Sequence, residues 1–76
     1  MKKIENKDCL VAFGRFIAAE REKQEIYQKD VAAKIGISQV YYSYIERGER
    51  AVDLVLALKI CEALGIDMRD FISNYM

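Results

Sequence analysis

The sequence of 76 residues contains no histidine, no proline and no tryptophan, and it has only two cysteines. Histidine is the commonest general base in enzymes, and no glycine-rich phosphate loop or activated serine or cysteine motif takes its place. Catalysis therefore has the least support among the functions considered. Cys9 and Cys61 form no CxxC pair, so we expect two buried thiols in a reducing compartment, with no metal site and no cofactor.

Long apolar runs are missing as well. No stretch approaches the roughly 20 apolar residues that span a membrane, and the first eight residues are too charged for a signal peptide. Hydrophobic residues nevertheless make up 53% of the chain, which is too many for a disordered segment. We therefore expect one cytoplasmic domain over residues 1–76 that makes no membrane contact and has no room for a small-molecule sensor domain.

The chain also lacks an excess of charge of either sign, with 12 basic and 12 acidic residues. This balance counts against nucleic-acid binding, because phosphate neutralisation normally dominates its affinity. The distribution is uneven, however: residues 27–50 hold four basic and three acidic side chains, whereas residues 53–76 hold two and four. A surface for DNA is expected within residues 27–50 or at Lys2, Lys3 and Lys7, with the acidic segment facing elsewhere.

Because no proline interrupts the chain, glycines and capping residues must mark the ends of its elements. Apolar residues recur at helical spacing, and Gly36, Gly48 and Gly65 each follow such a stretch, where glycine commonly ends a helix. The pattern predicts a compact all-α fold with five helices, over about 8–24, 28–35, 38–47, 53–64 and 67–75.

Two of these helices are joined by a very short turn. Only Ile37 separates Gly36 from Ser38, the expected N-cap of the helix over 38–47. A short turn with a glycine between two short helices is the signature of a helix-turn-helix, here at about 28–47. In such a motif the second helix lies in the major groove of double-stranded DNA and the first crosses the backbone.

The residues of this motif resemble a known family. The stretches Gln28–Ser38 (QKDVAAKIGIS) and Tyr42–Gly48 (YSYIERG) are similar to the lambda repressor/Cro-type (XRE) helix-turn-helix proteins, and Ala63–Ile66 resembles the end of that family's fourth helix. The run Glu46–Arg50 (ERGER) and the short chain also resemble the controller proteins of restriction–modification systems. The resemblance, over about residues 10–73, implies a lambda-repressor-like fold and a transcriptional regulator that binds a pseudo-palindromic operator as a homodimer.

Carried over by position, the resemblance assigns roles within the motif. The residues expected to read base edges are Ser38, Gln39, Val40, Ser43 and Tyr44. The residues expected to contact the DNA backbone are Gln28, Lys29, Tyr41, Arg47 and Arg50. Gln39 can bond adenine bidentately and Val40 can meet a thymine methyl group, which favours A·T pairs. The alternatives are solvated surface residues for the polar and charged side chains, and a protein-binding surface for Tyr44.

The resemblance also concerns how the motif is held. Arg21 and Glu46 match a family pair that ties the first helix to the end of the third. Arg21 falls on the apolar face of its helix, where an unpaired charge would be costly, so a structural ion pair is expected. Tyr27 stands where the family usually has Ser, Thr or Asn, so we expect that N-cap to be lost or replaced.

The fourth helix is apolar on more than one face. It is either a central helix enclosed by its neighbours or, with the fifth helix, part of a dimer surface; the interface candidates are Met68, Phe71, Ile72 and Tyr75. A second functional hypothesis uses the same features. An antitoxin or adaptor would use this fold mainly to bind another protein, and the neutral charge and the tyrosines near residue 42 allow it.

Overall fold

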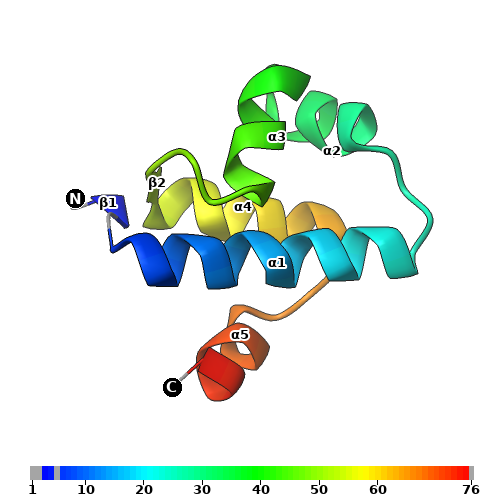
Figure 1. Cartoon of the computed structure of the whole chain (residues 1–76). Coiled ribbons are helices and arrows are strands. Elements are labelled where there is room, and N and C mark those ends of the chain that lie inside the picture. The colour runs from blue at the N-terminus through cyan, green and yellow to red at the C-terminus, as the bar shows by residue number, and fades with distance from the viewer. Residues whose placement is uncertain (1–2, 5, 76) are drawn as a thin grey trace.

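The computed structural model describes residues 3–4 and 6–75, with side chains from residue 6 onward. Its elements are β1 (Lys3–Ile4), α1 (Lys7–Lys23), α2 (Gln28–Ile35), α3 (Gln39–Glu46), β2 (Val52–Asp53), α4 (Leu54–Leu64) and α5 (Met68–Tyr75) (Figure 1). The predicted all-α fold is confirmed, and the predicted helix ranges differ from the observed ones by at most one residue at either end. The roles predicted for Lys2 and for the side chain of Lys3 lie outside the described residues.

One feature that the helical pattern did not predict is a short antiparallel strand pair. Lys3 lies opposite Asp53 and Ile4 lies opposite Val52. Two residues are too few to show the alternation that marks a strand in a sequence. The pairing brings the beginning of the chain beside the start of α4.

Capping residues account for where the helices begin and end. Asn6, Ser38 and Asp53 each accept a hydrogen bond from the backbone N–H three residues on, at 2.8–3.1 Å, so α1, α3 and α4 start there. Gly36 and Gly65 follow α2 and α4 with φ of 78° and 67°. This left-handed conformation carries little cost only for glycine, and it stops both helices.

The helices pack in layers, with α1 and α4 side by side in the middle of the molecule. The pair α2–α3 lies on one side of this layer and α5 on the other (Figure 1). The core between them contains Phe13, Ile17, Tyr42, Ile45 and Ile60, all almost completely buried. Burying a large apolar side chain contributes roughly 1.5–3 kcal/mol, so this core holds the helix-turn-helix firmly on α1 and α4.

The packing of α5 corrects one sequence prediction. Phe71, expected at a dimer interface, is only 7% exposed and packs within its own chain, with its ring centroid 5.4 Å from Phe13 and 5.5 Å from Phe16. Met68 is half-buried against the same core. Burial inside the chain removes Phe71 from the exposed surface, whereas Ile72 and Tyr75 remain exposed.

The structure tests one of the two interpretations of α4, that of a helix enclosed by its neighbours, while the dimer surface stays a prediction. Ala57, Ile60, Cys61 and Leu64 face the core, but the helix is not enclosed. Large apolar side chains of its outer face are 46–47% exposed; they are Leu54, Val55 and Leu58. One face of α4 therefore contributes to the core and another is open to solvent.

The two cysteines differ in their surroundings. Cys61 is buried, and burial raises the pKa of its thiol to about 11, so it stays protonated and unreactive near neutral pH. Cys9 is only half-buried, so the prediction of two buried thiols holds for Cys61 alone. Within residues 3–4 and 6–75, no helix has both the length and the apolar character required to cross a membrane.

Candidate nucleic-acid interface

Two glycines let the end of α3 approach α1 closely. A Cβ atom at Gly14 would overlap the carbonyl oxygen of Glu46 and would lie 2.7 Å from that of Ile45. Gly48 has φ of 73°, and a Cβ there would lie 2.7 Å from Cα of Val11. Because these neighbours are backbone atoms, a larger side chain at either position would push the two helices apart.

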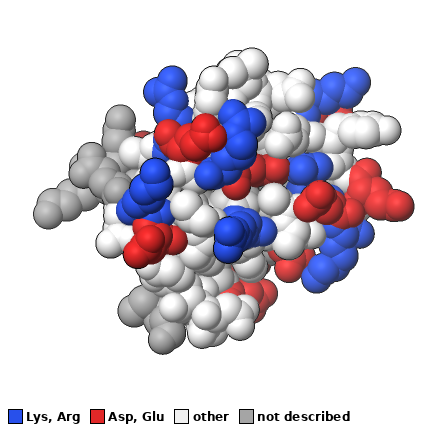
Figure 2. Space-filling model, in the orientation of Figure 1, with Lys and Arg blue, Asp and Glu red and all other residues white. Residues whose placement is uncertain are grey.

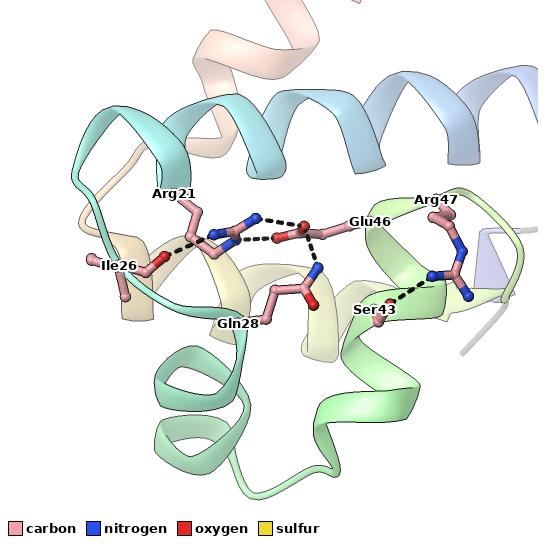
Figure 3. A network of polar contacts seen from close by, with 6 residues as sticks. All are labelled: Arg21, Ile26, Gln28, Ser43, Glu46 and Arg47. Atoms are coloured by element: carbon pink, nitrogen blue, oxygen red, sulfur yellow. Dashed lines mark hydrogen bonds and ion pairs between the residues drawn. The ribbon is translucent and has the colours of Figure 1, made fainter.

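A polar network fixes the same end of α3 from a second direction (Figure 3). The Arg21 guanidinium donates two hydrogen bonds to the Glu46 carboxylate, from Nε to Oε2 at 2.7 Å and from Nη2 to Oε1 at 3.1 Å. Its Nη1 donates to the carbonyl oxygen of Ile26 at 2.7 Å, and Gln28 Nε2 donates to Glu46 Oε1 at 2.8 Å. The network therefore joins α1, the loop after it, the start of α2 and the end of α3.

Burial makes this ion pair consequential. The Arg21 and Glu46 side chains are only 14% and 5% exposed. Burial alone would raise the pKa of Glu46, but hydrogen bonds from Arg21 and Gln28 outweigh it and hold the pKa of this carboxyl below its ordinary value. The hydrogen bond to Glu46 correspondingly raises the pKa of Arg21. Both groups are therefore charged at neutral pH.

The Tyr42 hydroxyl lies at the edge of this network. Among the described residues it is the one buried side-chain polar atom without a hydrogen bond of normal geometry. Burial, followed by the nearby Glu46 carboxylate, raises the pKa of Tyr42 well above its ordinary value. The ring fills a core position, and the hydroxyl remains neutral.

The outward face of α3 gathers most of the residues predicted to read bases. Gln39 and Val40 are exposed, Ser43 and Tyr44 are half-buried, and Tyr42 faces the core. Ser38 differs, because its Oγ already accepts the capping hydrogen bond from Tyr41 N–H. Its hydroxyl proton is still available to donate. Tyr41, predicted to touch phosphate, is half-buried and packs against the core through its ring.

Beyond the last turn of α3, two arginines lie over one tyrosine. The Arg47 guanidinium is 4.7 Å from the Tyr44 ring centroid and that of Arg50 is 5.6 Å from it. Arg47 Nη1 also donates to Ser43 Oγ at 2.8 Å, and its Nε donates to Glu49 Oε2 at 2.7 Å. Tyr44 thus holds two cations beside the face of α3, and Glu49 is a neighbour that the sequence analysis did not single out.

The start of α2 forms a second part of the surface. Tyr27, Gln28, Lys29 and Gln39 line a shallow hollow of about 260 Å³. As expected, Tyr27 supplies no side-chain cap to α2. Tyr27 is 70% exposed, and Lys29 Nζ lies 5.7 Å from the centroid of its ring. Sequence reasoning missed Tyr27 as a surface residue, although an aromatic side chain at a capping position was a signal. Gln28, predicted to hold phosphate, has its amide engaged with Glu46.

Basic and acidic side chains are mixed on the face that carries α1. Figure 2 shows basic and acidic side chains interspersed on the face that carries α1, without a continuous patch of one sign. Near the helix-turn-helix, basic side chains form two local groupings, Lys29 at the start of α2 and Arg47 with Arg50 over Tyr44.

Comparison with known proteins agrees with this geometry. A helix-turn-helix family model matches residues 17–71. The control protein C.MunI from a Mycoplasma species is 38% identical over 68 residues, which cover 88% of this chain and 92% of that protein.

Two solved structures are similar to most of the chain. The restriction–modification controller protein C.AhdI from Aeromonas hydrophila is 35% identical with a TM-score of 0.76, over 82% of this chain and 94% of that one. The clp gene regulator ClgR from Corynebacterium glutamicum is 26% identical with a TM-score of 0.81, over 84% and 83%.

Proposed function

Because the chain belongs to the helix-turn-helix family that includes the restriction–modification controller proteins, we propose that it is a sequence-specific transcriptional regulator that binds double-stranded DNA. The observation that carries the proposal is the face of α3. It projects Gln39, Val40 and Ser43 from a helix whose opposite side is locked into the core. A helix of this kind fits the major groove of B-DNA.

The proposed base contacts follow from side-chain chemistry. Gln39 offers both a donor and an acceptor, which match N7 and the N6 amino group of adenine. Val40 presents methyl groups that suit a thymine methyl. Ser43 accepts a hydrogen bond from Arg47, so its own proton is left to donate to a base acceptor.

Two local groupings are proposed to bind the DNA backbone on either side of α3. At the start of α2, no described side chain caps the helix, so its first backbone N–H groups and Lys29 suit a phosphate. Tyr27 extends this hollow. Beyond the end of α3, Arg47 and Arg50 present guanidinium groups next to the proposed base contacts. Phosphate contacts at two points set the register of a recognition helix.

We further propose that the protein binds as a homodimer. Exposed large apolar side chains remain on α4 and α5; they are Leu54, Val55, Leu58, Ile72 and Tyr75. A dimer formed through part of this surface would present two recognition helices to DNA, and the half-sites of helix-turn-helix dimers lie one DNA turn, about 34 Å, apart or multiples of it. Ile72→Glu is expected to convert the dimer to a monomer in sedimentation without changing helix content, and a dimer that survives this change would place the interface elsewhere.

The test of function is selection of bound duplexes from a random pool at two salt concentrations. Enrichment of a pseudo-palindrome by the wild type, and its loss in Gln39→Ala, is the expected result. Glu22→Ala, an exposed change on α1, is the matched control and should enrich the same sequence. Binding that falls steeply with salt and enriches nothing would leave only phosphate contact. That outcome would favour the antitoxin or adaptor hypothesis, in which the fold binds mainly protein.

A regulator of this kind needs no catalytic group, and we propose that the protein is not an enzyme. We also propose that it acts in the cytoplasm.

A further inference from the structure

One of the two arginines beyond α3 is already paired with a carboxylate. Arg47 Nε donates to Glu49 Oε2 at 2.7 Å, and the two side chains are 52% and 49% exposed. Arg50 forms no ion pair with any described residue, although both guanidinium groups lie over Tyr44. The cation that lies next to the Ser43 hydroxyl is therefore the one that is neutralised within the chain.

The backbone holds this carboxylate in place. Gly48 follows α3 in the left-handed conformation, and the N–H of Glu49 donates to the carbonyl oxygen of Tyr44 at 2.9 Å. This turn closes the helix and directs residue 49 back towards the last turn of α3. The Arg47 guanidinium is itself held on its other sides by Ser43 and by the Tyr44 ring. The ion pair is thus formed between two positioned groups.

We propose that Glu49 is an internal competitor for phosphate, which lowers the affinity of the protein for every DNA duplex without changing its base preference. The inference rests on the proposed function. Carboxylate and phosphate oxygens accept the same charge-assisted hydrogen bonds from a guanidinium group. For Arg47 to bind a phosphate through Nε, the Glu49 carboxylate must leave. The free-energy cost of displacing this carboxylate is the same for an operator and for any other duplex.

The size of the effect follows from the exposure of the pair. Ion pairs in which both side chains are about half exposed contribute little free energy. Displacing the Glu49 carboxylate from Arg47 therefore corresponds to roughly a two- to fivefold change in the dissociation constant for DNA. Operator and non-specific duplexes are both bound through their phosphates, so a penalty of this size lowers the affinity for both and leaves the ratio of the two affinities unchanged. The zero net charge of the chain acts in the same direction.

The experiment measures dissociation constants by fluorescence anisotropy for two labelled duplexes, the sequence obtained by selection and a scrambled version of it. Glu49→Gln is compared with Glu22→Gln, which removes the same charge from an exposed position on α1. Glu49→Gln should tighten both duplexes by the same two- to fivefold relative to Glu22→Gln. Equal affinities of the two variants would overturn the proposal. Weaker operator binding by Glu49→Gln would also overturn it, because it would identify Glu49 as a direct DNA contact, for example to a cytosine amino group.

A second background separates competition from simple repulsion of DNA. In a chain that carries Arg47→Gln, the guanidinium with which Glu49 forms its ion pair is gone. Competition therefore predicts that adding Glu49→Gln improves affinity less in this background than in the wild type. Repulsion alone predicts an equal or larger improvement, since the carboxylate is then unpaired, and that result would refute the proposal.

A measurement without DNA distinguishes failure of this inference from failure of the proposed function. The Nε–H signal of Arg47 in the free protein should be protected from exchange in the wild type and lose that protection in Glu49→Gln. If the wild type binds no duplex, the proposed function is wrong. The proposed competition is then wrong too, even if the Arg47 signal shows that the ion pair exists. If the wild type binds DNA but the signal is identical in both proteins, the competition fails by itself.

Discussion

Replacing Glu46 with alanine should destabilise the fold more than replacing an exposed glutamate with alanine. The side chain accepts two hydrogen bonds from Arg21 and one from Gln28. Its removal leaves the guanidinium with only the carbonyl oxygen of Ile26, in a site where its side chain is 14% exposed. The Gln28 amide loses its acceptor at the same time.

The magnitude follows from this burial. Removing one partner of a buried ion pair costs about 3–5 kcal/mol, and we take about 3 kcal/mol because Arg21 retains the Ile26 contact and some access to water. At roughly 0.05–0.15 kcal/mol per residue, a chain of this length has a total free energy of unfolding of about 4–11 kcal/mol. Each kcal/mol corresponds to about 4–8 °C in a small domain. We therefore expect the Tm to fall by about 12–24 °C.

Thermal unfolding followed by circular dichroism measures this directly. Glu22→Ala removes an exposed carboxylate from α1 and should change the free energy of unfolding by no more than about 0.5 kcal/mol. DNA affinity of Glu46→Ala should be measured well below its Tm, where loss of affinity reports a displaced α3. A Tm within about 2 °C of the wild type would refute the reasoning, since the pair would then contribute no net stability.

Three further predictions concern the contacts that hold the end of α3 against α1. Gly14→Ala should lower stability despite the roughly 1 kcal/mol gain in helix propensity, because the new Cβ overlaps the Glu46 carbonyl oxygen and overpacking costs about 1–3 kcal/mol; a higher urea midpoint would contradict this. Tyr42→Phe should leave the urea midpoint unchanged or slightly raised, because the lost hydroxyl has no hydrogen bond; a loss above about 2 kcal/mol would indicate a bond to Glu46. The pKa of Glu46 is lowered from its ordinary value of 4.5, so its stabilising contribution is present above that value and lost as pH falls through the lower folded pKa. Urea unfolding between pH 7 and pH 3 should therefore show a steeper loss of stability in the wild type than in Glu46→Gln, and parallel profiles would contradict it.

The local pattern of the sequence was sufficient for the helices but not for the details of the site. Helical spacing and the glycines after α2 and α4 mark element ends, because these signals act within a few residues. The face of α3 followed from the same periodicity. Whether Phe71 faced a partner or its own core could not be decided this way, since the answer depends on where α5 packs against α1. The pairing of Arg47 with Glu49 depends on side-chain rotamers, which the helical spacing of residues does not predict.

The way α3 is anchored has a consequence for how its binding preference can change. Its fixed points, the backbone contact with Gly14 and the ion pair with Arg21, both involve Glu46 at its C-terminal end. The outward side chains of its first turn, Gln39 and Val40, are exposed and absent from the core. With the base contacts proposed above, substitutions at Gln39 and Val40 would change the preferred DNA sequence without loosening the contacts that hold the helix, so new target sequences would be open to this scaffold while the constraints on its fold stay the same.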